Sequence, residues 1–377
     1  MKNKIAALLT IVPLLLCSAA CSPRDGADDG EKEKQYEYVS VLNDRNFRNG
    51  FEVNGIWNPI YGDPEEDAVE RYDLDNFGQK YYHGADYFDY DKGLQGPPSW
   101  TIHQAASRYP WHDRGNTVTE LKDGKQTFNY KFTDLGDERY LYQNQSKELE
   151  VDTKTSEFRL ALKSSECYKY DRAPMQEWPH LLLMQSMGTP EDIPKQIAVK
   201  NTQSIVVSLD LKLNSFADRM QGTPNPDLHA CVLMFYLEFY YMPSVAQGFT
   251  DFFYVGLTLF DNRTPFAVGT SGPDSGTKES ETNKWVYNIP GTHYWSPTNN
   301  LYDMKGNLIF DEWKSIDFEV YPYISLALGD AQRGDMFQGV TMDKLYLHHM
   351  YIGFESPGTY DVDMSFRNLD IQSYIEV

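Results

Sequence analysis

Cysteine is scarce in this chain: only four occur among 377 residues, and two of them, Cys17 and Cys21, lie near the N-terminus. No cysteines or histidines have the spacing of a structural zinc site, so the sequence gives no support for one. Cys167 and Cys231 can form a disulfide if the protein is exported, because oxidising compartments allow it. Cys231 lies in the apolar run 230–235, where it can equally be a small buried hydrophobic residue.

Positive charge is also scarce. The chain has 34 Lys and Arg residues against 55 Asp and Glu residues, which gives a net charge of −21. An acidic protein repels the phosphate backbone, so nucleic acid is not expected as a partner. A neutral or weakly charged ligand fits this charge better, although acidity also serves to keep an exported protein soluble.

The motifs of several enzyme classes are missing. The sequence has no GxSxG, no Gly-rich phosphate-binding loop and no Ser-His-Asp pattern. No segment repeats at a period of about 40 residues, which argues against a propeller. Strand patterns do not alternate with helix patterns, which argues against a parallel α/β fold.

The N-terminus has the pattern of an export signal. Basic residues 1–4 precede an apolar run at 5–16, which is too short to span a bilayer. Small residues at 18–20 then precede Cys21, and the sequence predicts a signal peptide over residues 1–20. This segment resembles the lipobox of bacterial lipoproteins, which implies that Cys21 is lipidated. The alternative is an ordinary secretory signal cut at the same place.

An acidic segment follows at 22–34 and carries almost no apolar side chains. Such a segment buries too little to offset the entropy of ordering it, so residues 21–36 are expected to form a flexible, lipidated tether. The segment resembles the surface-export signal of Bacteroidota lipoproteins. That resemblance implies a protein anchored in the outer membrane by its lipid and exposed at the cell surface.

Period-two alternation dominates the rest of the chain and predicts one domain over residues 37–377. Helical patterns occur only at 65–74 and 190–199, and long turn-rich segments lie at 58–100 and 269–298. Many strands with few short helices and long loops predict an all-β fold, an antiparallel β-sandwich of the jelly-roll, concanavalin-A-like kind. The expected strands lie at 156–163, 204–213, 228–242, 251–261, 314–328, 344–355 and 359–374.

Carboxylates and rings share faces of several expected strands. Alternation puts Tyr236, Glu238 and Tyr240 on one face of their strand, and Glu355 with His349 and Tyr351 on one face of another. Aromatic rings stack on sugars, and two carboxylates about 5–9.5 Å apart can hydrolyse a glycosidic bond. The plainer interpretation is that one face of a sheet carries such residues because it meets water.

Asp317 and Glu319 share a face with Tyr321 by the same alternation. Trp111 and Trp295 lie in loops, where each is either a sugar platform or a residue that pins its loop to the core. The catalytic candidates are therefore Glu238, Glu355, Glu319 and Asp317. The candidates for substrate binding are Tyr236, Tyr240, Tyr351, His349, Trp111, Trp295 and Tyr321.

No cofactor and no metal site are expected. Acidic residues at 73–91 can hold Ca²⁺ through oxygen ligands, but their spacing is not that of an EF-hand, and a solvated loop explains them. His348 and His349 are adjacent, so in a regular strand they point to opposite faces and cannot bind one metal.

Two short segments resemble glycoside hydrolases. Residues 315–319 (SIDFE) resemble the E-I-D-F-E signature of family 16, with Ser315 in place of its nucleophile; this implies a concanavalin-like fold without that activity. Residues 353–358 (GFESPG) and the strand after them resemble the acid-bearing strands of family 12. That resemblance implies Glu355 as general acid and Glu238 as nucleophile, although the Trp-rich nucleophile strand of the family is missing.

Together these patterns favour a cell-surface lipoprotein that binds polysaccharide, or an oligosaccharide from it, for capture or use. One alternative is a glycoside hydrolase or lyase that uses paired carboxylates on the sandwich face. The other is a structural or adhesive envelope protein without a small ligand.

Overall fold

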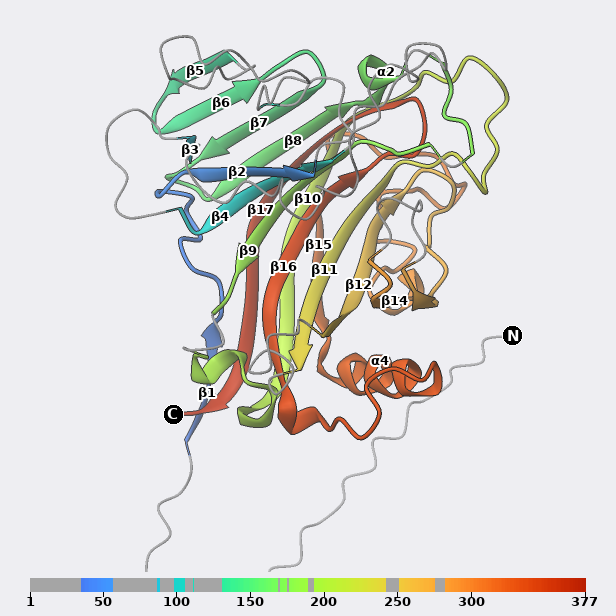
Figure 1. Ribbon diagram of the computed structural model, residues 1–377. Coiled ribbons are helices and arrows are strands. Elements are labelled where there is room, and N and C mark those ends of the chain that lie inside the picture. Colours follow the sequence, from blue (N-terminus) through green and yellow to red (C-terminus); the bar gives the residue numbers. More distant parts are fainter. Residues whose placement is uncertain are drawn as a thin grey trace, which may run out of the picture. The chain divides into compact units, whose positions relative to one another are not determined.

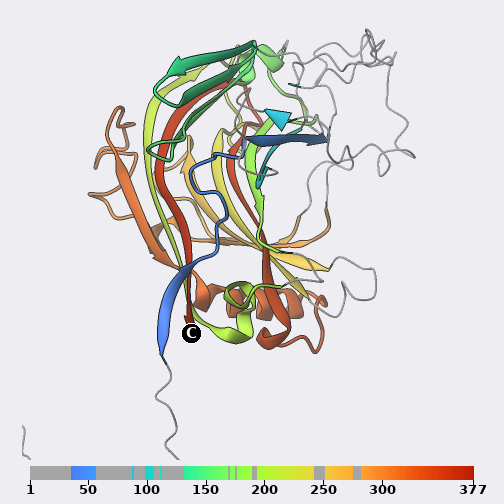
Figure 2. The same ribbon diagram turned by 90° about the vertical axis from the view of Figure 1, so that its left-hand side faces the viewer.

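Strands with alternating side chains form two sheets, which a computed structural model of the protein shows as separate layers (Figures 1 and 2). The structure describes residues 35–56, 87–88, 98–105, 111, 131–168, 170–174, 176–188, 193–241, 251–274 and 282–377, with backbone only at 53–56, 87–88 and 105. Residues 36–377 form one compact unit. The expected signal peptide, Cys21, residues 22–34 of the tether and the helix expected at 65–74 lie outside the described residues.

Sheet A has the strand order β15-β10-β17-β8-β7-β6-β5, with β1 also paired to β17. Every pairing within it is antiparallel. Its strands are β1 (Tyr36–Ser40), β5 (Lys131–Gly136), β6 (Arg139–Gln143), β7 (Lys147–Asp152), β8 (Glu157–Lys163), β10 (Thr202–Asp218), β15 (Lys314–Glu319) and β17 (Tyr360–Glu376).

Sheet B has the order β13-β14-β12-β11-β16-β9-β4-β2-β3. Its pairings are antiparallel except β12 with β14 and β2 with β4. Its strands are β2 (Phe51–Ile56), β3 (Tyr87–Phe88), β4 (Trp100–Ala105), β9 (His180–Ser186), β11 (Val232–Tyr241), β12 (Phe252–Asp261), β13 (Thr270–Pro273), β14 (Trp285–Ile289) and β16 (Leu345–Glu355).

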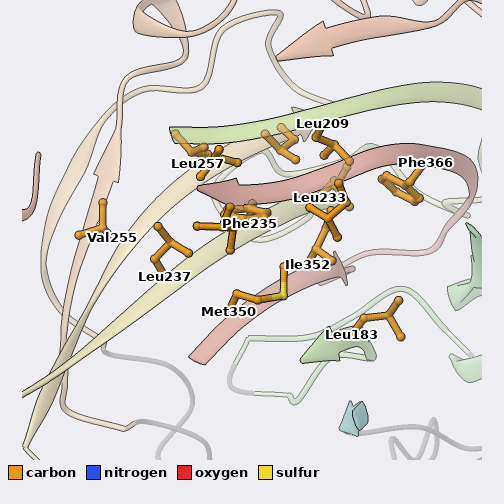
Figure 3. Packing of buried hydrophobic residues seen from close by; sticks show 14 of the residues in the cluster. Leu183, Leu209, Leu233, Phe235, Leu237, Val255, Leu257, Met350, Ile352 and Phe366 are labelled. Carbon is orange, nitrogen blue, oxygen red and sulfur yellow. The ribbon is translucent and has the colours of Figure 1, made fainter. Parts of the chain in front are cut away.

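The core lies between the two sheets. Leu209 of β10 and Phe366 of β17 pack in one cluster with Phe235 of β11 and Ile352 of β16, as Figure 3 shows. Two sheets that interdigitate their inner faces make a β-sandwich. The chain also passes repeatedly between the sheets, at β9, β10 and β11 and again at β15, β16 and β17, as in a jelly roll. The predicted all-β antiparallel sandwich is confirmed.

In the part of the chain that the structure describes, helices are few and short, as expected, and the longest is α4 (Tyr321–Arg333). The others are α2 (Ser164–Cys167), η2 (Lys195–Ile197), η3 (Val199–Asn201), η4 (Gly291–His293) and η5 (Met342–Lys344). Within the described ranges, no helix has the length and apolar character needed to cross a membrane.

Two predicted elements are wrong. The strand expected at 314–328 ends at Glu319, and Pro322 lies in the first turn of α4, where a proline is tolerated. Ile324, Ala327 and Leu328 are buried at helical spacing, a period that the alternation of residues 316–320 masked. The segment 269–298 was expected to be a loop, yet it contains β13, β14 and η4.

Candidate functional site

The outer face of sheet A is a paired, charged surface. The Arg159 guanidinium donates to both carboxylate oxygens of Asp363 and to Glu148 on the neighbouring strand. Arg367 of β17 donates to Asp210 of β10 in the same way. Because charges of opposite sign lie next to each other on adjacent strands, they satisfy one another across this face.

The outer face of sheet B carries rings instead. We use this name for the side chains of sheet B that point away from the core, with Tyr236, Glu238 and Tyr240 of β11 at its centre. In the register of the sheet, Tyr236 pairs with Tyr351 of β16, and Glu238 pairs with Tyr254 of β12. Tyr236 and Tyr254 have ring centroids 5.5 Å apart. Rings from three adjacent strands therefore form one aromatic surface.

Glu238 lies inside this aromatic surface and is only 1% exposed. His349 Nδ1 lies 2.9 Å from its Oε1, and the Tyr351 hydroxyl donates to its Oε2 at 2.9 Å. A buried carboxylate is costly unless it is hydrogen bonded, and both oxygens of Glu238 have a partner. Burial, and then the charge of Glu238, raise the pKa of Tyr254 and of Tyr351 well above the usual value.

A β-bulge lies beside this carboxylate. The register shifts between Glu238 and Phe239, whose partners are His349 and Leu347, so His348 is the extra residue. The rings of His348 and His349 stack with centroids 3.9 Å apart, although adjacent residues of a regular strand point to opposite faces. The expectation that these two histidines diverge is therefore wrong. Burial, and then the neighbouring His349, lower the pKa of His348 to about 4.

Gly256 of β12 leaves room for the ring of Tyr236. A Cβ at Gly256 would lie 2.5 Å from Tyr236 Cε1 and 2.3 Å from Asn288 Oδ1, and real Cβ contacts are not that short. The missing side chain thus lets the tyrosine lie against the backbone of the neighbouring strand.

Glu355, at the end of β16, marks a second part of this outer face. Its side chain is 25% exposed, and Trp178 Nε1 donates to its Oε2 at 3.4 Å. His180 Nε2 lies 3.8 Å from the same oxygen. Burial raises the pKa of Glu355 to about 7, and the charge of Asp274 contributes in the same direction. Glu355 thus exchanges its proton near neutral pH, as general acids in enzymes do.

The histidines around Glu355 are neutral at neutral pH. Burial lowers the pKa of His180 to about 4, and burial together with His180 lowers that of His103 of β4 to about 4. Nε2 of His180 is buried and has no hydrogen-bond partner among the described residues. An unpaired buried nitrogen of this kind calls for a partner from water or a ligand.

Glu238 and Glu355 lie on the same face but are not brought together. Glu238 pairs with His349, and Glu355 lies six residues further along β16, opposite Val232. At about 3.3 Å per residue, the two positions are about 20 Å apart along the sheet. Acid and nucleophile, or acid and base, need carboxyls about 5–9.5 Å apart. The suggestion that these two residues act as one catalytic pair is therefore wrong.

Glu319 and Asp317 belong to the other sheet, on its edge strand β15. Glu319 accepts hydrogen bonds from Ser204 Oγ and from the backbone amides of Ile205 and Tyr321, so it fixes the start of α4. Asp317 is exposed on sheet A. Tyr321 begins α4 rather than continuing the strand. The grouping of these residues with Glu238 is wrong, because β15 lies in sheet A.

Trp111 and Trp295 are core residues. Trp111 is fully buried, and its backbone amide donates to Gln104 Oε1. Trp295 is 5% exposed, and its Nε1 donates to the carbonyl of Leu259. The prediction that either tryptophan is a surface platform for sugar is wrong, and the alternative, a loop residue pinned to the core, describes both.

Cys167 and Cys231 are both buried and unpaired in the structure. Burial raises the pKa of the Cys231 thiol to about 12. Within the described ranges, no three His, Cys, Asp or Glu side chains are grouped so as to hold a metal ion. The acidic residues Asp73, Asp75, Asp86, Asp89 and Asp91 lie outside those ranges.

Sequence reasoning placed Tyr236, Tyr240, Tyr351, His349, Glu238 and Glu355 on the outer face of one sheet. It missed Tyr254, which the pairing of β11 with β12 places opposite Glu238. It also missed His180 and Asp274 as neighbours of Glu355. Nothing in the sequence pairs His180 with Glu355, because the register between the non-consecutive strands β9 and β16 determines its position.

No protein-family model matches this sequence, and no curated protein matches it. Among solved structures, an endoglucanase from Rhodothermus marinus is similar with 11% identity and a TM-score of 0.33, over 66% of this chain and 97% of the other. A family 12 xyloglucanase from Bacillus licheniformis has 8% identity and a TM-score of 0.35, over 64% and 96%. A family 11 xylanase from Neocallimastix patriciarum has 10% identity and a TM-score of 0.31, over 65% of this chain and 96% of the other. Because the identities and TM-scores are this low, these enzymes do not indicate the activity of this chain.

Proposed function

We propose that the protein binds a polysaccharide on the outer face of sheet B. The observation that carries this proposal is the difference between the two outer faces of the sandwich. On sheet A, charges such as Arg159 and Asp363 pair with each other, whereas on sheet B tyrosines from three strands lie side by side. Aromatic rings are the groups that stack on the apolar faces of sugars, and their hydroxyls bond the sugar hydroxyls.

The positions of Glu238 and Glu355 fit glycan binding without cleavage better than they fit hydrolysis by a pair of carboxylates. Glu238 has both oxygens occupied by His349 and Tyr351 and is 1% exposed, so its carboxylate organises the rings rather than meeting a ligand. The register places Glu355 about 20 Å away, too far for the two carboxyls to act on one bond.

Hydrolysis stays as a second candidate because of Glu355 alone. Its pKa of about 7 suits a general acid, and the charge of Asp274 acts on it. A hydrolase of this kind would use Glu355 as the acid and would need a second carboxylate other than Glu238. Release of reducing ends from a bound glycan tests this candidate, and Glu355→Gln should then abolish turnover while leaving binding in place.

We also infer a lipid anchor, on the sequence alone. The small residues before Cys21 and the acidic segment at 22–34 support lipidation and export to the outer membrane surface. Labelling cells with a palmitate analogue tests the anchor: the chain should carry the label, and Cys21→Ser should remove it. A labelled Cys21→Ser variant would contradict the proposal.

Native affinity electrophoresis of the full-length chain, in gels that contain glucan, xylan, mannan, alginate or polygalacturonate, tests the binding function. Retardation by at least one glycan is expected. If none of them retards the chain, the glycan-binding function is wrong, and a structural or adhesive role in the envelope takes its place.

A further inference from the structure

The surroundings of Glu355 form a small polar site that the tyrosine surface does not include. Glu355 of β16 pairs in register with His180 of β9, and Trp178 comes two residues before His180 in the chain. The Trp178 and His180 rings lie edge to face, with centroids 5.7 Å apart. A carboxyl group, an imidazole and an indole are thus held together at one end of the outer face.

Two atoms of this site have hydrogen-bonding capacity to spare. His180 Nε2 has no partner among the described residues, and Glu355 Oε2 has only the long 3.4 Å bond from Trp178. The two atoms are 3.8 Å apart, which is too far for a hydrogen bond between them. A single hydroxyl oxygen between them would lie within hydrogen-bond distance of both, and to reach His180 Nε2 it must displace the atoms that close this nitrogen off from solvent.

The ionisable side chains within this site are negative or neutral, and the cation beside it, Arg172, donates to backbone carbonyls. Asp274 acts on Glu355 from the end of β13, while His180 and His103 are held neutral by burial. Arg172 lies over the Trp178 ring at 4.7 Å, but its guanidinium donates to the backbone carbonyls of residues 176 and 228. A ligand anion would therefore meet two carboxyl groups and find no uncommitted cation among these residues.

We propose that Glu355, His180 and Trp178 form a subsite for an uncharged sugar ring, in which one sugar hydroxyl bridges Glu355 Oε2 and His180 Nε2. The subsite takes neutral glycans and rejects rings that carry a carboxylate or a sulfate. This inference rests on the proposed glycan binding and adds the class of sugar and the residues that select it.

Affinity electrophoresis of the full-length chain at neutral pH tests the subsite, with glucan and xylan as neutral probes and polygalacturonate and alginate as acidic probes. We expect retardation by a neutral glycan alone. Glu355→Ala and His180→Ala should each weaken binding about tenfold, because each removes a partner of the bridging hydroxyl. Glu355→Gln should weaken binding less than Glu355→Ala, since the amide keeps the shape of the side chain and one acceptor.

Asp317→Asn on sheet A is the matched control and should bind normally. Circular dichroism shows whether each variant folds; if the alanine variants do not, His180→Asn and Glu355→Leu remove the same hydrogen bonds with less loss of volume. Preferential binding of an acidic glycan would overturn the subsite, and so would neutral binding that no change at Glu355 or His180 weakens. If no glycan binds, the proposed function itself fails.

Discussion

His349 Nδ1 lies 2.9 Å from Glu238 Oε1, across two neighbouring strands of sheet B. The β-bulge at His348 lies next to His349, and the Tyr351 hydroxyl occupies the second carboxylate oxygen. A side chain that alternation alone would leave facing water is in this way enclosed in a hydrogen-bonded group, which holds the tyrosine surface in place.

This arrangement predicts that removing the Glu238 carboxylate strongly lowers the stability of the protein. Glu238→Ala should lower the free energy of unfolding by about 2–5 kcal/mol, because it leaves the donors of His349 and Tyr351 without an acceptor in a buried place. Glu238→Gln should cost less, since the amide oxygen still accepts one bond. Urea denaturation measures both. Asp317→Ala, at an exposed position, should change stability by only about 0.5 kcal/mol or less, and an equally mild Glu238→Ala would contradict this role.

Gly256 offers a test of the contact with Tyr236. Gly256→Ala should lower stability by about 1–3 kcal/mol and displace the Tyr236 ring, because the new Cβ would lie 2.5 Å from that ring. Gly272→Ala on the edge strand β13 is the control, since a Cβ there meets no atom within 4 Å. Thermal unfolding of the two variants should separate them clearly. Equal melting temperatures would mean that the ring does not lie against Gly256.

Glu355 predicts an unusual pH dependence of stability. Its pKa rises from 4.5 to about 7 on folding, so the folded state holds a proton that the unfolded state releases. The stabilisation is therefore complete below about pH 4.5 and is lost as the pH rises through 7, with a magnitude on the order of 3 kcal/mol. The difference in stability between the unchanged chain and Glu355→Gln isolates this effect. A difference that stays constant from pH 4 to 8 would count against the burial of this carboxyl.

His103 and His180 change the stability with pH in the direction opposite to that of Glu355. The pKa values of His103 and His180 fall from 6.5 to about 4 on folding, so the unfolded chain takes up protons first as the solution is acidified. Their contribution is present above pH 6.5 and is lost as the pH falls to about 4. His103→Gln should flatten the decline in stability on the acid side, and denaturation curves at a series of pH values measure the slope. An unchanged slope would show that His103 titrates normally.

The cysteines should be unreactive until the protein unfolds. Cys231 is buried and its thiol pKa is raised to about 12, so little thiolate forms at neutral pH. Without reductant, iodoacetamide should leave Cys167 and Cys231 unmodified in the native chain and should modify both in denaturant. Mass spectrometry of the digested protein reads out both thiols. A disulfide between them in the denatured sample would contradict the unpaired state.

The sequence predicted the sandwich because alternation over seven segments is a strong and local signal. Ile316 and Phe318 alternate well, and they concealed the helix that begins at Tyr321. Alternation also predicts which residues of one strand share a face, so Tyr236 and Glu238 were grouped correctly. The separation between residues of different strands could not be predicted. Glu238 lies opposite His349, six residues from Glu355, because of the register of β11 with β16, and no local pattern encodes that register. The bulge at His348 is equally invisible in the sequence.

Burial of the tryptophans could not be predicted either. Trp111 and Trp295 lie outside the strands in sequence, and only the packing of distant segments shows that they fill the core. Trp178 stood in a similar loop and lies next to Glu355. A tryptophan in a loop therefore predicts that the loop makes a packing contact, and only the structure identifies the residues that it contacts.

Two tryptophans beside opposite sheets distinguish glycan binding on the outer face of sheet B from binding on sheet A. Trp178 contacts Glu355 beside sheet B and has Arg172 over its ring, while Trp313 has Arg367 and Lys212 of sheet A over its ring. In affinity electrophoresis with the glycan that retards the unchanged chain, Trp178→Ala should lose most of the retardation and Trp313→Ala should keep it. Loss with Trp313→Ala and none with Trp178→Ala would place the glycan on sheet A instead.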